Sequence, residues 1–94
     1  MDGRFEWDED KNRANRLKHG ISFEEAQAIF DGPIRTAPDL RKGYGEERYL
    51  AVGRLGEAIV VVVVFTPRGQ RMRSISARKA NREERRAYSE YLQT

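Results

Sequence analysis

One stretch of the chain decides its fold, the run EAIVVVVVF at residues 57–65. β-Branched residues lose rotamer freedom in a helix and pack well on a pleated surface, so the run predicts a strand. Because successive side chains of a strand point to opposite faces, an uninterrupted apolar run needs cover on both of them. We therefore expect a central strand, with helices of the same chain or a second chain over each face. The run is too short to cross a bilayer, which takes roughly 20 helical residues, so no membrane contact is expected.

The composition limits the kinds of site that the chain can form. Its 94 residues suffice for one small domain, which we expect to span residues 1–94. The absence of cysteine excludes disulfides and thiolate metal sites, and a single histidine excludes a His-rich zinc site. We therefore predict that the protein needs no metal and no other cofactor. Without cysteine, and without the apolar segment of a signal peptide at its start, the chain is expected in the cytoplasm.

The positive charge of the chain is concentrated in its last third. Residues 1–65 carry 10 Lys or Arg and 12 Asp or Glu, a net charge of −2. Residues 66–94 carry 8 basic and 3 acidic side chains, a net charge of +5. A basic block on an otherwise balanced domain is typical of a protein that binds a polyanion, most often nucleic acid. The alternative is a solvated surface that serves only solubility.

A polar helix is expected near the N-terminus, over residues 9–18. Asp8 stands where a helix N-cap belongs, and Gly20 can take the left-handed conformation that ends a helix. Only Ala14 and Leu17 are apolar inside this segment. We therefore expect the helix to pack through that narrow stripe.

Two further helices are predicted from capping boxes, in which a polar N-cap residue is followed three positions later by Glu. Ser22 and Glu25 begin one of these helices, which ends near residues 31–33, and Asn81 and Glu84 begin the other. Because only a few residues separate the first two helices of the chain, they are expected to form a helical hairpin.

The remaining segments predict strands around the valine run. They are a short strand at residues 4–7, a weak edge strand from 34 to about 40, and strands at 47–53 and 71–77, with a loop at 41–46 and a turn at 66–70. The strands before and after the valine run would flank it in an antiparallel meander. The expected fold is therefore α+β, with an N-terminal helical hairpin, an antiparallel sheet of about four strands and a C-terminal helix.

Alternation along the last strand does not indicate its core face. In a regular strand, odd positions from Arg71 to Ile75 share one face and even positions from Met72 to Ser76 share the other. Neither set is apolar. On this pattern Ser74 either lies near the sheet edge or weakens the core.

Several motifs resemble the BrnT family of type II toxins. They are FEWD at residues 5–8, KHGISFEEA at 18–26, GEER at 45–48 and SARKA at 76–80, with Glu84, Arg85 and Tyr88 beyond them. The similarity runs through nearly the whole chain. It implies a RelE-like fold and a ribonuclease toxin that cleaves mRNA and stops translation.

The same resemblance implies a set of partners. RNA would be the substrate, with ribosome contact as an option. A ribbon-helix-helix antitoxin encoded beside the toxin, BrnA-like, would neutralise it. Operator DNA would be bound only through that antitoxin.

Three arginines are candidates for binding the reacting phosphate. Metal-free RNA cleavage needs cations on the transition state, a base for the 2′-hydroxyl and an acid for the leaving oxygen. Arg48, Arg73 and Arg78 can supply permanently charged, bidentate contacts to phosphate. We expect them to converge on one concave surface of the sheet. The alternative is that each arginine only covers a sheet edge with its aliphatic stem.

His19 and Glu47 are the candidates for proton transfer. Histidine titrates near neutral pH, which suits a catalytic acid or base. The alternative for His19 is a cation that stabilises the C-terminal end of its helix. The alternative for Glu47, and for its neighbour Glu46, is an ion pair with Arg48.

Four more basic residues are expected to bind the RNA backbone: Lys11 and Lys18 on the first helix, and Arg68 and Arg71 beside the last turn. The two lysines lie about two turns apart and suit one edge of an RNA groove. A solvated helix face explains them equally well.

A second function fits the same residues, a non-enzymatic RNA- or ribosome-binding module that blocks translation. Phosphate contacts dominate the affinity in both cases, so charge does not separate them. Direct DNA binding ranks last, because no helix-turn-helix recognition helix is evident.

Trp7 and Tyr88 are interpreted as packing residues, with base stacking as the alternative.

Overall fold

The computed structural model describes residues 3–41 and 45–94. The predicted loop at 41–46 includes residues 42–44, which lie outside the described ranges. The helical elements are α1 (Glu9–His19), α2 (Phe23–Ala26), the 3-10 helix η1 (Gln27–Asp31) and α3 (Arg82–Leu92). The strands are β1 (Phe5–Glu6), β2 (Ile34–Pro38), β3 (Tyr49–Leu55), β4 (Ile59–Arg68) and β5 (Arg71–Lys79).

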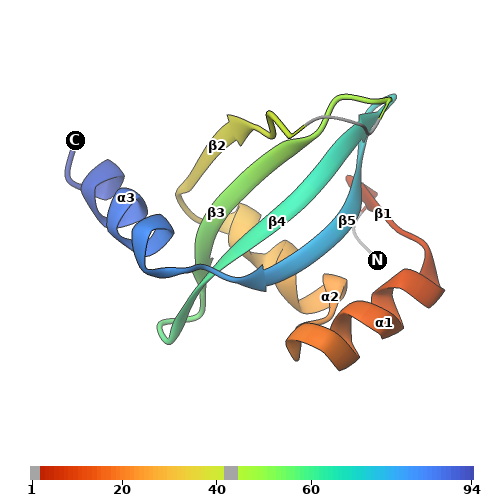
Figure 1. Ribbon diagram of the computed structural model, residues 1–94, viewed down its shortest axis with the longest axis horizontal. Helices are drawn as coiled ribbons and strands as arrows, with labels where there is room; N and C mark the ends of the chain where they lie inside the picture. The colour runs from red at the N-terminus through yellow and green to blue at the C-terminus, as the bar shows by residue number, and fades with distance from the viewer. Residues whose placement is uncertain (1–2, 42–44) are drawn as a thin grey trace.

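Within the described ranges these strands form one sheet of five, in the order β1-β5-β4-β3-β2 (Figure 1). Neighbours from β5 to β2 are antiparallel, whereas β1 pairs with β5 in parallel. The sheet is therefore mixed, and the expected antiparallel sheet of about four strands is corrected. The direction of β1 depends on how the chain enters and leaves it, which alternation within two residues does not encode.

Several element boundaries also differ from expectation, and β3 begins and ends two residues later than the predicted 47–53. The helix predicted to end near residues 31–33 is α-helical only to Ala26 and continues as η1 to Asp31. The turn predicted at 66–70 is shorter, because β4 runs to Arg68 and β5 begins at Arg71. Gly69 has a φ of 60°. Glycine adopts this conformation readily, which allows a tight hairpin.

The valine strand β4 lies inside the sheet, as predicted, and the chain covers both of its faces. Val61 and Val63 pack with residues of α2 and η1 on one face, called the α2 face below. Val62 packs with Tyr88 of α3 on the other, the α3 face. Val64 also points to the α3 face, and all four valines are at most 3% exposed. A second chain is therefore not needed to cover this strand.

Helix α1 packs through asparagines and not through the predicted apolar stripe. Ala14 is exposed and Leu17 is 89% exposed, so that prediction is wrong. The buried residues of α1 are Asn12 and Asn15, three positions apart. Asn12 Oδ1 accepts a hydrogen bond of 2.8 Å from the backbone N–H of Phe23. The surface that α1 meets presents backbone polar groups, which amides can satisfy and aliphatic side chains cannot.

The predicted helix caps are confirmed. Asp8, Ser22 and Asn81 each accept a hydrogen bond from a backbone N–H in the first turn of α1, α2 and α3. Gly20 follows α1 with a φ of 74°. Figure 1 shows α1 and α2 next to each other, as the expected hairpin, with α3 beside another part of the sheet. Every helix of the described ranges is too short or too polar to cross a lipid bilayer.

Candidate active site

A β-bulge in β5 decides which of its side chains share a face. Val64 pairs with Ser76, but the next residue of β4, Phe65, pairs with Ser74. Ile75 is the extra residue between these two pairs. Directly opposed residues of antiparallel strands point to the same side, so one extra residue reverses the alternation beyond it. The regular alternation assumed from the sequence is therefore wrong across this strand.

The bulge also identifies the core face of β5. Ser74 lies opposite Phe65, which packs against the core of the α2 face. Ala77, on the other side of the bulge, belongs to the same core and is fully buried. Ser74 is 7% exposed, so the α2 face accepts a small hydroxyl at this position.

Arg73 and Arg78 both point to the α3 face because of the bulge. Arg73 pairs with Thr66 and Arg78 pairs with Val62, and these two partners are four positions apart on β4. At roughly 3.3 Å per residue the two pairs are about 13 Å apart along the strand. Ser76 lies between the two arginines on the same face.

The other predicted arginines lie on this face too. Arg68 and Arg71 pair with each other at the hairpin end of β4 and β5. Extending the register of β3 and β4 by one position places Arg48 opposite Thr66. Thr66 Oγ1 donates a 2.6 Å hydrogen bond to the carbonyl oxygen of Glu47, which holds this end of β3 against β4. The sheet thus brings together the arginines that the sequence placed at the site.

Carboxylates hold the two central arginines. Arg73 Nη1 donates a hydrogen bond of 2.8 Å to Glu6 Oε2, and these two residues are directly paired between β1 and β5. Arg78 donates to both oxygens of Glu84, at 2.7 and 2.9 Å. Both ion pairs are partly buried. An anion that binds either guanidinium must therefore compete with a carboxylate or use the remaining N–H groups.

The hydrogen bonds between Arg78 and Glu84 favour the charged form of both side chains. The hydrogen bonds from Arg78 are the main reason that the pKa of Glu84 lies below its usual value of 4.5. The same bonds raise the pKa of Arg78, while its partial burial and, less strongly, the positive charge of Arg41 act in the opposite direction. Both partners are therefore charged at neutral pH, and Arg41 lies close enough to influence Arg78.

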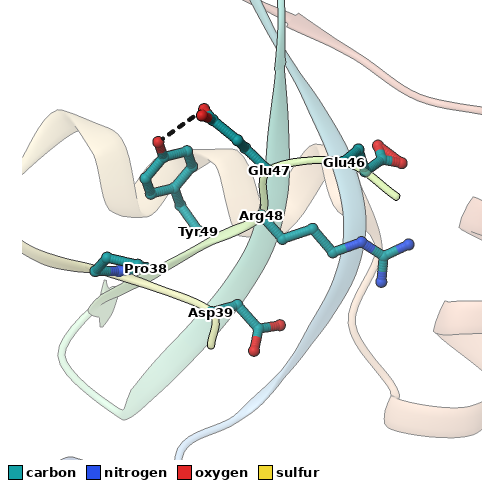
Figure 2. A pocket seen from close by; sticks show the side chains of 6 residues that line it. All are labelled: Pro38, Asp39, Glu46, Glu47, Arg48 and Tyr49. Atoms are coloured by element: carbon teal, nitrogen blue, oxygen red, sulfur yellow. Dashed lines mark hydrogen bonds between the residues drawn. The ribbon is translucent and has the colours of Figure 1, made fainter. Parts of the chain in front are cut away.

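A pocket of about 240 Å³ lies at the start of β3. Figure 2 shows Arg48 and Asp39 extending to one side of the chain, with Glu47 and Tyr49 on the other. The hydroxyl of Tyr49 donates a 3.1 Å hydrogen bond to Glu47 Oε2, and this contact raises the pKa of Tyr49. The structure therefore does not bring the carboxylate of Glu47 together with Arg48.

Asp39 belongs to the arginine face. Its backbone N–H donates to the carbonyl oxygen of Arg48 at 2.8 Å, which extends the pairing of β2 and β3. Arg41 donates to its two carboxylate oxygens at 2.9 and 2.6 Å. These bonds are the main reason that the pKa of Asp39 is lowered, and the charge of Arg48 lowers it further. Asp39 is thus an ionised carboxylate that is hydrogen-bonded to Arg41 and influenced by the charge of Arg48.

His19 lies at the other side of β5, in a second pocket of about 240 Å³. Lys11 and Lys18 line the same pocket, together with Ser76 and the bulged Ile75. Because Ser76 lies between Arg73 and Arg78, this basic pocket borders the arginine face. The structure therefore brings the predicted helix residues next to the predicted arginine strand.

Sequence reasoning missed the residues that orient these cations. Glu6 was noted only within a family motif, because nothing local indicates an ion pair with Arg73 that depends on the pairing of β1 and β5. Asp39 and Arg41 were not singled out, although they are only two positions apart. Glu84 was assigned to its capping box, which the structure also contains, and to the family motifs, but not to an ion pair with Arg78. Asn15 was missed as well, although two asparagines at helical spacing in a segment with few apolar residues were a usable signal.

The described residues include no group of three or more His, Asp or Glu side chains that could hold a metal ion.

The packing interpretation of the aromatic residues Trp7 and Tyr88 is confirmed. Trp7 meets Phe23 edge-on with the ring centres 6.0 Å apart, and Tyr88 is 3% exposed. Neither ring is presented as a free platform for a base.

Comparison with known proteins agrees with the motifs. Residues 7–84 match the sequence model of a family described as the ribonuclease toxin BrnT of type II toxin-antitoxin systems. The chain belongs to the BrnT family. The matched range contains every residue that was predicted to be catalytic or to bind RNA.

A solved BrnT structure has a similar fold. It is the 1.1 Å crystal structure of the Brucella abortus ribonuclease toxin BrnT, with a TM-score of 0.59 and 26% sequence identity. The similarity covers 81% of this chain and 94% of that one. No curated protein matches the chain significantly. The resemblance noted from the motifs is thus confirmed.

Proposed function

We propose that this BrnT-family chain is an endoribonuclease that cleaves mRNA without a metal ion and so inhibits translation. One observation carries the proposal. The bulge in β5 brings Arg73 and Arg78 to the face that carries Arg48, with Arg73 opposite Arg48 across β4. Ser76, which lies between these two arginines, lines the pocket of His19. Cations and an imidazole beside one strand are groups that metal-free RNA cleavage can use.

The arginines bind the backbone and stabilise the transition state. The scissile phosphate lies over Ser76, between Arg73 and Arg78, and takes over part of the hydrogen bonding that Glu6 and Glu84 now receive. Arg48 contacts the same strand of RNA from the β3 side. Negative charge grows on the non-bridging oxygens as the 2′-oxygen attacks, so fixed guanidinium groups stabilise that state more than the ground state.

His19 transfers the proton. The 2′-oxygen forms a bond to phosphorus as the bond from phosphorus to the 5′-oxygen breaks. One group removes the proton of the 2′-hydroxyl and one protonates the leaving 5′-oxygen. His19 lines the pocket that contains Ser76, which supports its role in one of these steps. Glu47 points away from Arg48 and has no such support.

The flanking basic residues bind neighbouring nucleotides. Lys11 and Lys18 extend the positive surface from Ser76 along α1, and Arg68 and Arg71 extend it to the hairpin end of β5. Such contacts act on the backbone and not on base identity, and their strength falls as the salt concentration rises.

The experiment is RNA cleavage by the purified chain in EDTA, followed by end analysis. A 2′,3′-cyclic phosphate and a 5′-hydroxyl are expected, and added Mg²⁺ should not be required. His19→Gln should bind the same RNA and cut it far more slowly. Binding without cutting by the unaltered chain would instead support the alternative, a non-enzymatic RNA- or ribosome-binding module.

Membership of the BrnT family supports a proposal for the partners. Type II toxins are paired with a protein antitoxin, and we propose a ribbon-helix-helix antitoxin that neutralises this chain in the cytoplasm and supplies the operator DNA contacts. Co-expression of the product of the adjacent open reading frame should abolish RNA cleavage and growth arrest. Full activity in the presence of that product would contradict the pairing.

A further inference from the structure

Asn15 joins helix α1 to the edge of β5 through its side-chain amide. Its Nδ2 donates to the carbonyl oxygen of Ala77 at 2.9 Å, and its Oδ1 accepts from the N–H of Ala77 at 3.1 Å. Nδ2 also donates to the carbonyl oxygen of Ile21 at 2.8 Å. Asn15 is 7% exposed, and this group of hydrogen bonds is buried.

The side-chain amide of Asn15 hydrogen-bonds the backbone edge of β5 beyond the residues that β1 pairs with. β1 pairs with β5 only at Met72 and Arg73, so it does not reach the backbone of Ala77. A side-chain amide has one acceptor and two donors in a plane, which matches the N–H and C=O that a strand presents at its edge. An apolar residue of similar size would fill the space without fixing the position of α1 along β5.

This contact sets where the basic end of α1 lies relative to the arginine strand. Lys18 and His19 follow Asn15 by about one helical turn, and Ala77 lies between Ser76 and Arg78. We propose that Asn15 is a positioning residue for RNA cleavage. It holds Lys18 and His19 in fixed register with Ser76 and Arg78, so that one RNA backbone can contact both sets. This inference rests on the function proposed above.

Asn12 provides a matched control. It lies one turn earlier on the same helix and is 5% exposed. Its amide bonds to Phe23 N–H and to the Glu24 carboxylate, which belong to α2 and not to β5. Loss of either asparagine removes a buried hydrogen-bonding amide from α1. Of the two, Asn15 is hydrogen-bonded to the strand that carries Arg73 and Arg78, and Asn12 is not.

The test compares Asn15→Ala and Asn12→Ala for binding and single-turnover cleavage of a fluorescein-labelled single-stranded RNA oligonucleotide. Denaturant unfolding gives the folded fraction of each variant, and both should lose stability. Asn15→Ala should lose on the order of tenfold in cleavage rate beyond its unfolded fraction, because small misplacement of reacting groups is costly. Asn12→Ala should cleave at the rate of the unaltered chain once corrected for folding.

A double-mutant cycle separates positioning from a merely structural role. Lys18→Ala should weaken RNA binding in the unaltered chain but add less than about twofold in the Asn15→Ala background, since contacting residues and coupled networks are non-additive. Full additivity, or equal cleavage by the two asparagine variants, would overturn the inference. If Asn15→Ala does not fold, Asn15→Asp, which keeps the acceptor for Ala77 N–H, takes its place with the same expected outcome. An unaltered chain that neither binds nor cuts RNA would instead refute the proposed function.

Discussion

Arg73 and Arg78 lie on the same face of the sheet although they are five positions apart on β5. A regular strand would send side chains separated by an odd number of positions to opposite faces. The extra residue Ile75 removes this difference, because β4 advances by four positions while β5 advances by five. Bulges are known to re-aim side chains next to active sites, and here the bulge assembles the arginine face.

The arginine pair gives the most direct prediction. Arg73→Ala and Arg78→Ala should each lower RNA cleavage by on the order of 10²- to 10³-fold, as removal of a group that stabilises the transition state does. Both should relieve growth arrest when expressed without the antitoxin. Lys79→Ala is the control, because Lys79 neighbours Arg78 but pairs with Val61 on the α2 face. Unchanged toxicity of both arginine variants would show that the site is assigned wrongly.

The ion pair of Arg78 and Glu84 predicts a pH-dependent stability. The pKa of Glu84 is lowered in the folded chain, so the carboxylate contributes stability above its usual pKa of 4.5 and loses it as the pH falls through the lowered value. Glu84→Gln should remove this part of the acid sensitivity. At pH 7 it should cost about 1 kcal/mol, a reduced figure because Arg78 is partly solvated.

Unfolding by urea between pH 3 and pH 7 measures this effect. Glutamine suits the third position of a capping box, so α3 should keep its N-terminal cap in this variant. A Glu84→Gln chain with the same loss of stability on acidification as the unaltered chain would contradict the assignment.

Gly53 is required by close packing between β3 and η1. A Cβ atom at this position would lie 2.8 Å from Ile29 Cβ and 3.1 Å from Ile34 Cγ2. Gly53→Ala should therefore lower the free energy of unfolding by about 1 to 3 kcal/mol, the usual effect of overpacking. Gly32→Ala is the control, because its Cβ would meet nothing within 4 Å. Equal unfolding midpoints for the two variants would count against this packing.

A hydrogen bond from Tyr88 connects α3 to the segment before β2. The hydroxyl of Tyr88 donates a 2.7 Å hydrogen bond to the carbonyl oxygen of Pro33. Tyr88→Phe keeps the buried ring and loses this bond, so we expect a loss of about 1 kcal/mol in unfolding free energy. Tyr91→Phe changes the neighbouring stacked ring, which is 43% exposed, and should have little effect. A Tyr88→Phe chain as stable as Tyr91→Phe would show that the bond contributes nothing.

The elements that the sequence predicted well depend on neighbouring residues. Asp8, Ser22 and Asn81 cap their helices through hydrogen bonds within one turn, and Gly20 ends α1 by a backbone preference of its own. The valine run specifies a central strand because its side chains demand apolar cover on both faces. Such signals are present in any short window of the chain.

The sequence identified most residues of the candidate site but not how they are arranged in space. The arginines were identified from residue type and from the family motifs, but the carboxylates that pair with them were not recognised as their partners. Glu6 meets Arg73 because β1 pairs with β5, and Asp39 lies beside Arg48 because a backbone hydrogen bond extends the pairing of β2 and β3. These contacts depend on strand pairing across the sheet, which no local pattern records.

By itself, the sequence determined the α+β class, the valine strand at the centre, the helix caps, and the membership of the BrnT family. The tertiary structure alone decided the parallel pairing of β1, the packing of α1 through Asn12 and Asn15, and the common face of Arg73 and Arg78. The reason is physical. Helix caps and apolar runs depend on a few adjacent residues. The strand register, the bulge in β5 and the pairing at the sheet edge depend on which strand lies opposite, and only the folded sheet determines its neighbour.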